Sequence, residues 1–186
     1  HTLSGAKLLK EMGFTRVVLS REMSREEIKY IADNVNIELE VFVHGALCMC
    51  VSGQCYFSAM LGGRSGNRGY CAQTCRLPFK VDGCDHALSL KDNSIIYYLD
   101  DMESIGVTSA KIEGRMKRPE YVASAVKACY EKREKGFIST ATMENLKNVF
   151  SRTGFTDGYY TNHLGHDMFG YRKKEDVVSA TEKLFR

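Results

Sequence analysis

A chain of 186 residues, 44% of them apolar, is long enough to form one domain with a sizeable core. Its formal net charge of only +3 requires no polyanionic partner, so a local basic patch would have to bind one. No apolar run approaches the length of a membrane span, and the first residues suit an amphipathic helix rather than a signal peptide. We therefore expect a cytoplasmic protein without a membrane partner. Because the chain begins at His1 without an initiator Met, we also expect a piece of a longer protein.

Helix and strand patterns alternate at the start of the chain. The predicted elements are a helix capped by Ser4 and ended at Gly13, a strand over 15–20, a helix opened by a capping box of Ser24 and Glu27 and running to about Asp33, and a strand over 38–43. This order at short spacing indicates parallel strands joined by crossover helices.

The same alternation resumes after residue 86. The predicted elements are a strand over 87–90, a helix capped by Asp92 and stopped at Gly106, a strand over 108–112, and a helix from Pro119 to Gly136. Cys129 lies on the apolar stripe of the last helix, so we predict that it is a core residue. The period is then lost, with a short helix over 143–150 and a final helix over 175–185.

These steps amount to about half of a (β/α)8 barrel, which typically needs roughly 250 residues. We therefore predict an α/β fold, a partial TIM-barrel-like domain with an inserted cysteine-rich element. The domain covers 1–137 with the insertion at 46–84, and 138–186 form a helical and irregular carboxyl-terminal segment. Either the missing strands lie upstream of the chain, or the piece forms an open sheet whose edges self-association would cover.

Five of the seven cysteines lie within residues 40–79. Four of them are spaced as C-x6-C-x15-C-x3-C, namely Cys48, Cys55, Cys71 and Cys75. Glycines between them allow positive φ angles, which let the chain fold back and bring separated thiols together. The pattern indicates a metal cage. Cys50 and Cys84 have no place in the pattern and are assigned to nothing.

The spacing favours an iron–sulfur cluster over zinc. A structural zinc site usually has paired cysteines at both ends, and only Cys71 and Cys75 come close to that spacing. Iron–sulfur clusters also use four thiolates and tolerate ligands spread over longer loops. Two disulfides, or free thiols without a common role, are the other interpretations. The odd number of cysteines and the lack of a signal peptide argue against disulfides.

Residues 41–81 contain no Asp or Glu but several basic residues, Arg64, Arg68, Arg76 and Lys80. Cations beside four thiolates would favour the thiolate form and tune the potential of a cluster. Aromatic residues interleave with these charges, as they do in nucleic-acid grooves, so the three arginines are candidate phosphate ligands in RNA. A solvated basic loop is the plainest alternative.

Reactive groups of parallel α/β folds collect at the carboxyl ends of the strands. Those ends supply His44 in the first half of the chain and Lys111, Glu113 and Arg115 in the second. Lys111 and Glu113 are two residues apart on a strand and therefore share one face. We take these four as candidate catalytic or substrate-binding residues. A structural Glu–Lys ion pair and a hydrogen-bonded wall histidine are the alternatives.

Familiar hydrolase signatures are missing from the sequence. It has neither an H-E-x-x-H zinc motif nor a G-x-S-x-G nucleophile elbow. A cysteine nucleophile with His44 as its base stays formally open. Cysteines that hold a metal could not also attack a peptide.

Three blocks of the sequence resemble peptidase family U32, the collagenase-like peptidases of unknown catalytic type. The blocks are ELEVFVHGALCMCVSGQCYFSAMLGGRSGNRGYCAQTCR, SLKDNSIIYYLDDMESIGVTSAKIEGRMKRPEYV and TGFTDGYY. The resemblance implies a barrel-like domain of which this chain is the carboxyl-terminal half. It also implies a function, because better-understood relatives take part in hydroxylating a pyrimidine in transfer RNA or ribosomal RNA, and others act in oxygen-independent ubiquinone hydroxylation.

The same resemblance implies a cofactor and partners. Those relatives carry a four-iron, four-sulfur cluster on four cysteines, and the matching positions are Cys48, Cys55, Cys71 and Cys75. In the transfer-RNA branch prephenate is implicated as a co-substrate. We therefore expect an iron–sulfur protein that acts on RNA, with a peptidase acting on a peptide substrate as the alternative. A structural metal-binding module is a third possibility.

Overall fold

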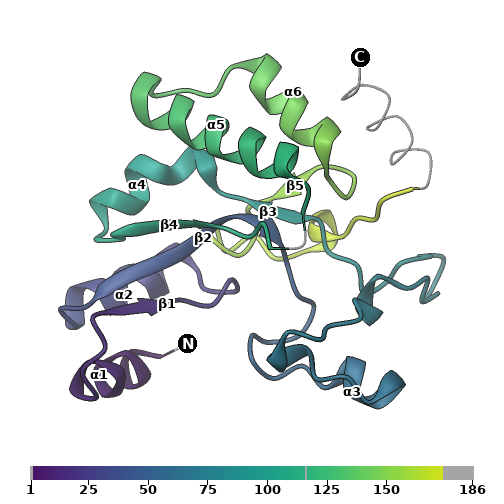
Figure 1. Ribbon diagram of the computed structural model, residues 1–186, viewed down its shortest axis with the longest axis horizontal. Helices are drawn as coiled ribbons and strands as arrows, with labels where there is room; N and C mark the ends of the chain where they lie inside the picture. The colour runs from purple at the N-terminus through teal and green to yellow at the C-terminus, as the bar shows by residue number, and fades with distance from the viewer. Residues whose placement is uncertain (1, 116, 174–186) are drawn as a thin grey trace.

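The computed structural model describes residues 2–115 and 117–173, and Figure 1 shows a sheet with helices packed against it and a separate loop-rich lobe. The helices are α1 (Leu3–Glu11), α2 (Arg25–Asn34), α3 (Phe57–Gly62), α4 (Leu99–Ser104), α5 (Pro119–Lys135) and α6 (Thr140–Val149). The strands are β1 (Arg16–Val18), β2 (Glu38–Ala46), β3 (Asp92–Ser94), β4 (Ser109–Ile112) and β5 (Phe155–Thr156). Among the helices described, none is long and apolar enough to cross a membrane.

Strand β2 is the centre of the sheet. Strands β1 and β4 run parallel to it, as predicted for this part of the chain, whereas β3 is antiparallel to β2 and β5 is parallel to β3. The sheet is therefore mixed, in the order β1-β2-β3-β5 with β4 also paired to β2, and over the described residues it does not close on itself. The α/β class is confirmed, and the half-barrel is not.

Local capping signals locate the ends of the helices. Ser24 forms the predicted capping box at the start of α2: its hydroxyl accepts a backbone N–H three residues on, and its own N–H donates to a glutamate. Helix α5 begins with Pro119 and ends before Gly136, as predicted, and Gly136 adopts the left-handed conformation with φ +77°. Helix α1 is capped by Thr2 rather than by Ser4 as predicted, because the Thr2 hydroxyl accepts the backbone N–H of Gly5.

The region around β3 differs most from the sequence prediction. The predicted strand over 87–90 and the helix capped by Asp92 are wrong: Asp92 starts a strand, and α4 begins only after a further 3-10 turn. Asp92 caps no helix because its carboxylate is buried in an ion pair with Arg152 and its backbone pairs with Ala46 of β2. Since residues 47–91 return through a lobe and not through a crossover helix, β3 approaches β2 antiparallel.

The main core lies between β2 and the helices α2 and α4. Alternate residues of β2, Leu39, Val41 and Val43, are buried there, and the residues between them point to the opposite face. A second cluster joins α5 to α6, which lie side by side in Figure 1. Cys129 packs against both clusters, and burial raises the pKa of its thiol to about 11. Its predicted place in the core is confirmed.

The carboxyl-terminal part contains α6 where a short helix over 143–150 was predicted. Strand β5 and a 3-10 turn at His166–Met168 follow it. The final predicted helix, over 175–185, lies outside the described residues.

Candidate functional site

The cysteine-rich lobe, defined here as residues 47–91, leaves the sheet at the end of β2 and returns to it at β3 (Figure 1). A carboxylate from outside the lobe fastens its first turn. The two carboxylate oxygens of Glu22 accept the backbone N–H of Ser52 at 2.7 Å and its hydroxyl at 2.8 Å. The loop after β1 therefore holds the start of the lobe in place.

Arg76 joins the two ends of the lobe. Its guanidinium donates to the carbonyl oxygen of Leu47 and, at 2.6 Å, to the carbonyl oxygen of Leu90. Burial lowers its pKa, as does the neighbouring positive charge of Arg152. Arg76 therefore points into the protein, whereas the other two predicted phosphate ligands, Arg64 and Arg68, are exposed.

Two of the predicted ligand cysteines, Cys71 and Cys75, act on the thiol of a third, Cys48. Cys48 keeps exposed surface, yet surrounding protein atoms desolvate its thiol and raise its pKa. The nearby thiols of Cys75 and Cys71 act in the same direction, while the guanidinium groups of Arg21 and Arg76 favour the thiolate. Soft sulfur donors beside fixed cations suit an iron–sulfur cluster or zinc.

The fourth sulfur has another neighbour. Cys55 hydrogen-bonds with Cys50, and desolvation together with this contact raises the pKa of Cys50. Within 2–115 and 117–173, no three His, Cys, Asp or Glu side chains are arranged to hold a metal ion. The donor types therefore fit a thiophilic group, and a complete set of four sulfurs that includes Cys55 stays a prediction.

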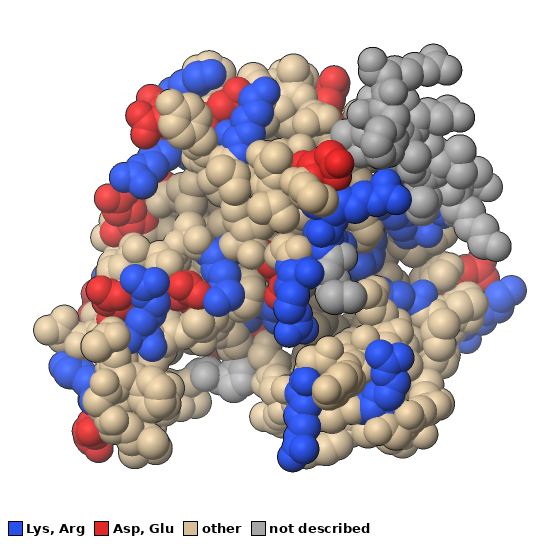
Figure 2. Space-filling view, viewed as in Figure 1, with Lys and Arg blue, Asp and Glu red and all other residues tan. Residues whose placement is uncertain are grey.

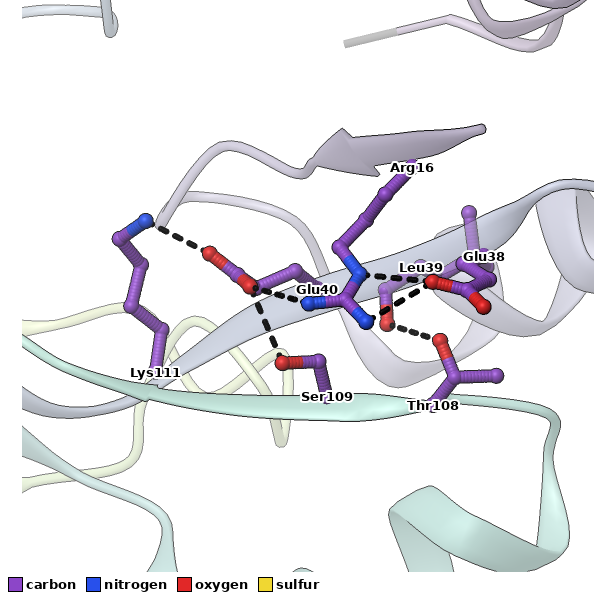
Figure 3. A network of polar contacts seen from close by, with 7 residues as sticks. All are labelled: Arg16, Glu38, Leu39, Glu40, Thr108, Ser109 and Lys111. Carbon is purple, nitrogen blue, oxygen red and sulfur yellow. Dashed lines mark hydrogen bonds and ion pairs between the residues drawn. The ribbon is translucent and has the colours of Figure 1, made fainter. Parts of the chain in front are cut away.

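Figure 3 shows Lys111 of β4 beside Glu40 of β2. Because Glu40 alternates with the core residues Leu39 and Val41, this face of the sheet is opposite the main core. The Lys111 ammonium lies 2.6 Å from a carboxylate oxygen of Glu40. Glu40 also accepts the Ser109 hydroxyl at 3.0 Å and lies 3.4 Å from Arg16, which in turn pairs with Glu38 at 2.8 Å. The hydrogen bond from Lys111 is the main cause of a lowered pKa of Glu40. Lys111 thus belongs to a ladder of ion pairs.

Glu113 shares that face, as its spacing from Lys111 predicted. Its carboxylate lies 2.9 Å from a guanidinium nitrogen of Arg21, and the Arg21 guanidinium carbon lies 4.0 Å from the centre of the Phe42 ring. Gly45, with φ +143°, permits this approach because a Cβ there would collide with the Glu113 side chain. Lys111 and Glu113 are therefore brought together, but each already has a partner of opposite charge.

The other two predicted strand-end residues lie in different surroundings. Arg115 is exposed, with its guanidinium 3.5 Å from where a Cβ of Gly69 would lie, so it reaches towards the cysteine-rich lobe. His44 is fully buried between Tyr121 and Phe155, with ring centroids 5.3 and 5.1 Å away. Burial lowers its pKa to about 4, so the ring is neutral at physiological pH.

Sequence reasoning missed a buried charged centre beside His44. Asp92 and Arg152 form an ion pair whose side chains are 0% and 7% exposed, although 60 residues separate them. Lys117 lies nearby with its ammonium 3.0 Å from the centre of the Phe150 ring. Asp92 carried the signal of a helix cap, and Arg152 lies in a stretch without periodicity, so no local pattern indicated the pair.

The fold and the site define this chain as a mixed α/β protein with a cysteine-rich lobe and charged groups at the strand ends. The chain belongs to peptidase family U32, because the model of that family matches residues 1–169. No solved structure matches it significantly.

Its relatives include proteins named for RNA modification and for proteolysis. It is 38% identical over 164 residues to the 23S rRNA 5-hydroxycytidine C2501 synthase of Escherichia coli strain K12, which covers 81% of this chain and 25% of that protein. It is 36% identical to the tRNA hydroxylation protein P1 of Bacillus subtilis strain 168, over 89% of this chain and 44% of that protein. It is also 36% identical to a collagenase of Porphyromonas gingivalis, over 91% of this chain and 47% of that protein. The chain thus spans a quarter to about half of the length of these relatives.

Proposed function

We propose that this chain is part of an iron–sulfur protein that takes part in hydroxylating a pyrimidine in transfer RNA or ribosomal RNA. The observation that carries the proposal is the similarity, at 38% and 36% identity, to two relatives named for RNA hydroxylation. Because the chain covers less than half of either relative, the activity belongs to the whole protein, and this piece contributes the cysteine-rich lobe and the sheet edge beside it.

The cluster in this proposal is held by the four patterned cysteines, Cys48, Cys55, Cys71 and Cys75. The effects of the Cys71 and Cys75 thiols and of two guanidinium groups on the thiol of Cys48 support the assignment. A four-iron, four-sulfur cluster supplies one-electron transfer when bound. The chain's own contribution is to supply thiolates, and Arg76 keeps the ends of the lobe together so that the thiols stay near one another.

Iron and sulfide analysis after anaerobic reconstitution tests the cluster. We expect about four irons per chain with a matching sulfide content and a broad visible absorption band. Cys75→Ser should lose most of the iron, whereas Cys84→Ser, at an exposed cysteine outside the pattern, should keep it. Zinc bound in place of iron, or equal iron in the two variants, would refute the assignment.

The exposed part of the lobe is the proposed RNA-binding surface. Arg64 and Arg68 are exposed there, and so are Tyr56 and Tyr70 of the same lobe, which are 70% and 64% exposed. Figure 2 shows basic side chains on this lobe, and residues 41–81 contain no carboxylate side chain to oppose them. Exposed rings between cations suit stacking with bases and pairing with phosphates.

Salt-dependent RNA binding tests this surface. Each phosphate contact to a single strand contributes about 0.7 to the slope of log affinity against log salt, so replacing Arg64 and Arg68 together by Gln should lower the slope by about 1.4. Replacing the exposed Lys7 and Lys10 of α1 by Gln removes the same charge elsewhere and should leave the slope unchanged. Equal slopes for the two double variants would defeat the proposal.

Lys111, Glu113 and Arg115 stay proposed ligands for an anionic co-substrate, for which the family resemblance implies prephenate. Lys111 and Glu113 pair with Glu40 and Arg21, so a ligand at this face would have to exchange with those partners. An Arg115→Gln variant that hydroxylates RNA with unchanged dependence on prephenate would contradict the assignment.

Proteolysis is the second candidate, favoured by the 36% identity to a collagenase. It needs a nucleophile and a base in contact. Cys50 hydrogen-bonds with Cys55, and neither ring nitrogen of His44 has a hydrogen-bond partner among the described residues. We therefore place RNA modification first. A peptidase activity that disappears in both Cys50→Ser and His44→Ala would reverse this order.

A further inference from the structure

Positive charges gather around the ring of Phe150, outside the cysteine-rich lobe and outside the ladder of ion pairs that Lys111 and Glu40 belong to. The Lys117 ammonium lies 3.0 Å from the ring centre, and the guanidinium carbons of Arg172 and Arg152 lie 4.5 and 4.9 Å from it. One aromatic ring attracts one cation by about 0.5–2 kcal/mol, and three cations around it repel one another. The ring alone does not explain why they gather here.

Among the described residues whose charges act most strongly on Lys117, cations outnumber carboxylates. Asp92 is the one carboxylate among them, while Arg152 and Arg76 bring two guanidinium groups. The one carboxylate is already paired with Arg152. A surplus of positive charge in a desolvated place is unfavourable unless an anion joins it.

Hydrogen-bonding groups beside these charges have no partner among the described residues. The Tyr121 hydroxyl and both ring nitrogens of His44 are buried without one. These two residues are 1% and 0% exposed. A hydroxyl and the one N–H of a neutral imidazole are donors, so they suit the oxygens of an anion.

Asp92 adds a requirement of the opposite kind. Its oxygen Oδ1 pairs with Arg152, while Oδ2 is buried and has no partner among the described residues. A carboxylate oxygen can only accept. A ligand that satisfies it must therefore present a hydroxyl beside its charged oxygens.

The position in the fold agrees with a ligand site. Asp92 pairs in register with Ala46 at the end of β2, and Lys117 follows the end of β4. Carboxyl ends of neighbouring parallel strands are the usual place for ligands in α/β proteins. Lys117, Phe150 and Arg172 are only half-buried, so a small molecule can reach them from solvent.

We propose that Lys117, Arg152 and Asp92 form a binding site for a small oxyanion that carries a hydroxyl group, of the hydroxycarboxylate or phosphoryl class. Arg152 and Lys117 pair with the charged oxygens, the Tyr121 hydroxyl donates to them, and Asp92 Oδ2 accepts the hydrogen bond of the ligand hydroxyl. This inference rests on the charges and unpartnered groups of this chain and does not depend on RNA hydroxylation.

Two matched pairs of probes test the site by calorimetric titration at constant ionic strength. Glycolate differs from acetate, and phosphate from sulfate, in carrying a hydroxyl. We expect saturable binding of glycolate or phosphate, and an affinity at least about tenfold lower for its partner without a hydroxyl. Which pair binds tells a hydroxycarboxylate from a phosphoryl ligand. Absence of saturable binding for all four probes would overturn the proposal, and acetate and sulfate binding as tightly as their partners would overturn the role of Asp92.

The variants separate a built site from general attraction to positive charge. Lys117→Gln should weaken binding of the preferred probe by about tenfold or more, because it removes a charged hydrogen-bond donor. Lys127 is exposed on α5, the helix that follows Lys117. Lys127→Gln makes the same change of charge and should bind the probe as tightly as the original chain does. Circular dichroism checks that both variants fold. Equal weakening in the two variants would refute the site.

The pH dependence gives a second readout of Lys117. Burial, together with the charges of the three guanidinium groups, lowers the pKa of Lys117 to about 8 against the opposing charge of Asp92. Glycolate keeps its charge from neutral pH upward, so its affinity should fall as the pH rises through the pKa of Lys117 and should not fall in Lys117→Gln. The charged groups that act on Lys117 are Asp92, Arg152, Arg172 and Arg76. Burial raises the pKa of the neighbouring Tyr121 hydroxyl and lowers the pKa of the His44 ring, so both stay neutral in this range.

Discussion

Replacing Asp92 by Asn should destabilise the chain strongly. The Asp92 and Arg152 side chains are 0% and 7% exposed, and removing one partner of a buried ion pair costs about 3–5 kcal/mol because it leaves the other charge unpaired. Asn has nearly the same shape, so lost packing adds little. By contrast, Asp33 and Lys29 pair on the surface of α2 with side chains 55% and 47% exposed. Such an exposed pair contributes about 0.3–0.5 kcal/mol.

Urea unfolding followed by circular dichroism measures the difference. We expect Asp92→Asn to lower the free energy of unfolding by at least about 3 kcal/mol and Asp33→Asn to lower it by less than about 0.5 kcal/mol. Adding Arg152→Met to Asp92→Asn should restore part of the loss, since no unpaired Arg152 charge then remains. Similar losses in the two single variants, or a double variant whose loss is the sum of its parts, would refute the reasoning.

Three further predictions concern the scaffold around the site. The backbone N–H and the hydroxyl of Ser139 each donate to the Glu131 carboxylate at 3.0 Å. These hydrogen bonds, of which the backbone one has the larger effect, lower the pKa of the Glu131 carboxyl to about 2. The stability gained from Glu131 should therefore be present above its ordinary pKa of 4.5 and be lost as the pH falls towards 2, and Glu131→Gln should flatten this part of an acid-unfolding profile. Ser24→Ala removes the cap of α2 and should lower the free energy of urea unfolding by about 1 kcal/mol. Glu22→Ala removes both bonds to Ser52 and should speed limited proteolysis of the cysteine-rich lobe by about tenfold, and a lobe cut at the original rate would contradict this role.

Elements with local signals were predictable from the sequence. The capping box at Ser24, the Pro119 start and Gly136 end of α5, and the alternation along β2 each depend on residues a few positions apart. The shared face of Lys111 and Glu113 follows from the same short-range geometry. These signals operate before any tertiary contact forms, so one sequence is enough to find them.

Other features depend on contacts between distant parts of the chain. Asp92 has the local signal of a helix cap, but its pairing with Arg152 and with the end of β2 outweighs that signal. Arg76 lies in a basic stretch typical of phosphate ligands, but its guanidinium donates to two carbonyl oxygens at the ends of the lobe. In each case the deciding partner lies too far along the chain for periodicity or spacing to indicate it.

The cysteine-rich lobe and the proposed oxyanion site meet at one end of the sheet because β2 ends there. Ala46 pairs with Asp92, and two residues later Cys48 is the first cysteine of the pattern. Arg76 lies between the two regions: its charge acts on the thiol of Cys48 and on the ammonium of Lys117. A guanidinium that favours the Cys48 thiolate also adds to the surplus of positive charge around Lys117. Arg76 therefore acts on both regions, and we expect a ligand bound at either proposed site to alter the electrostatic environment of the other.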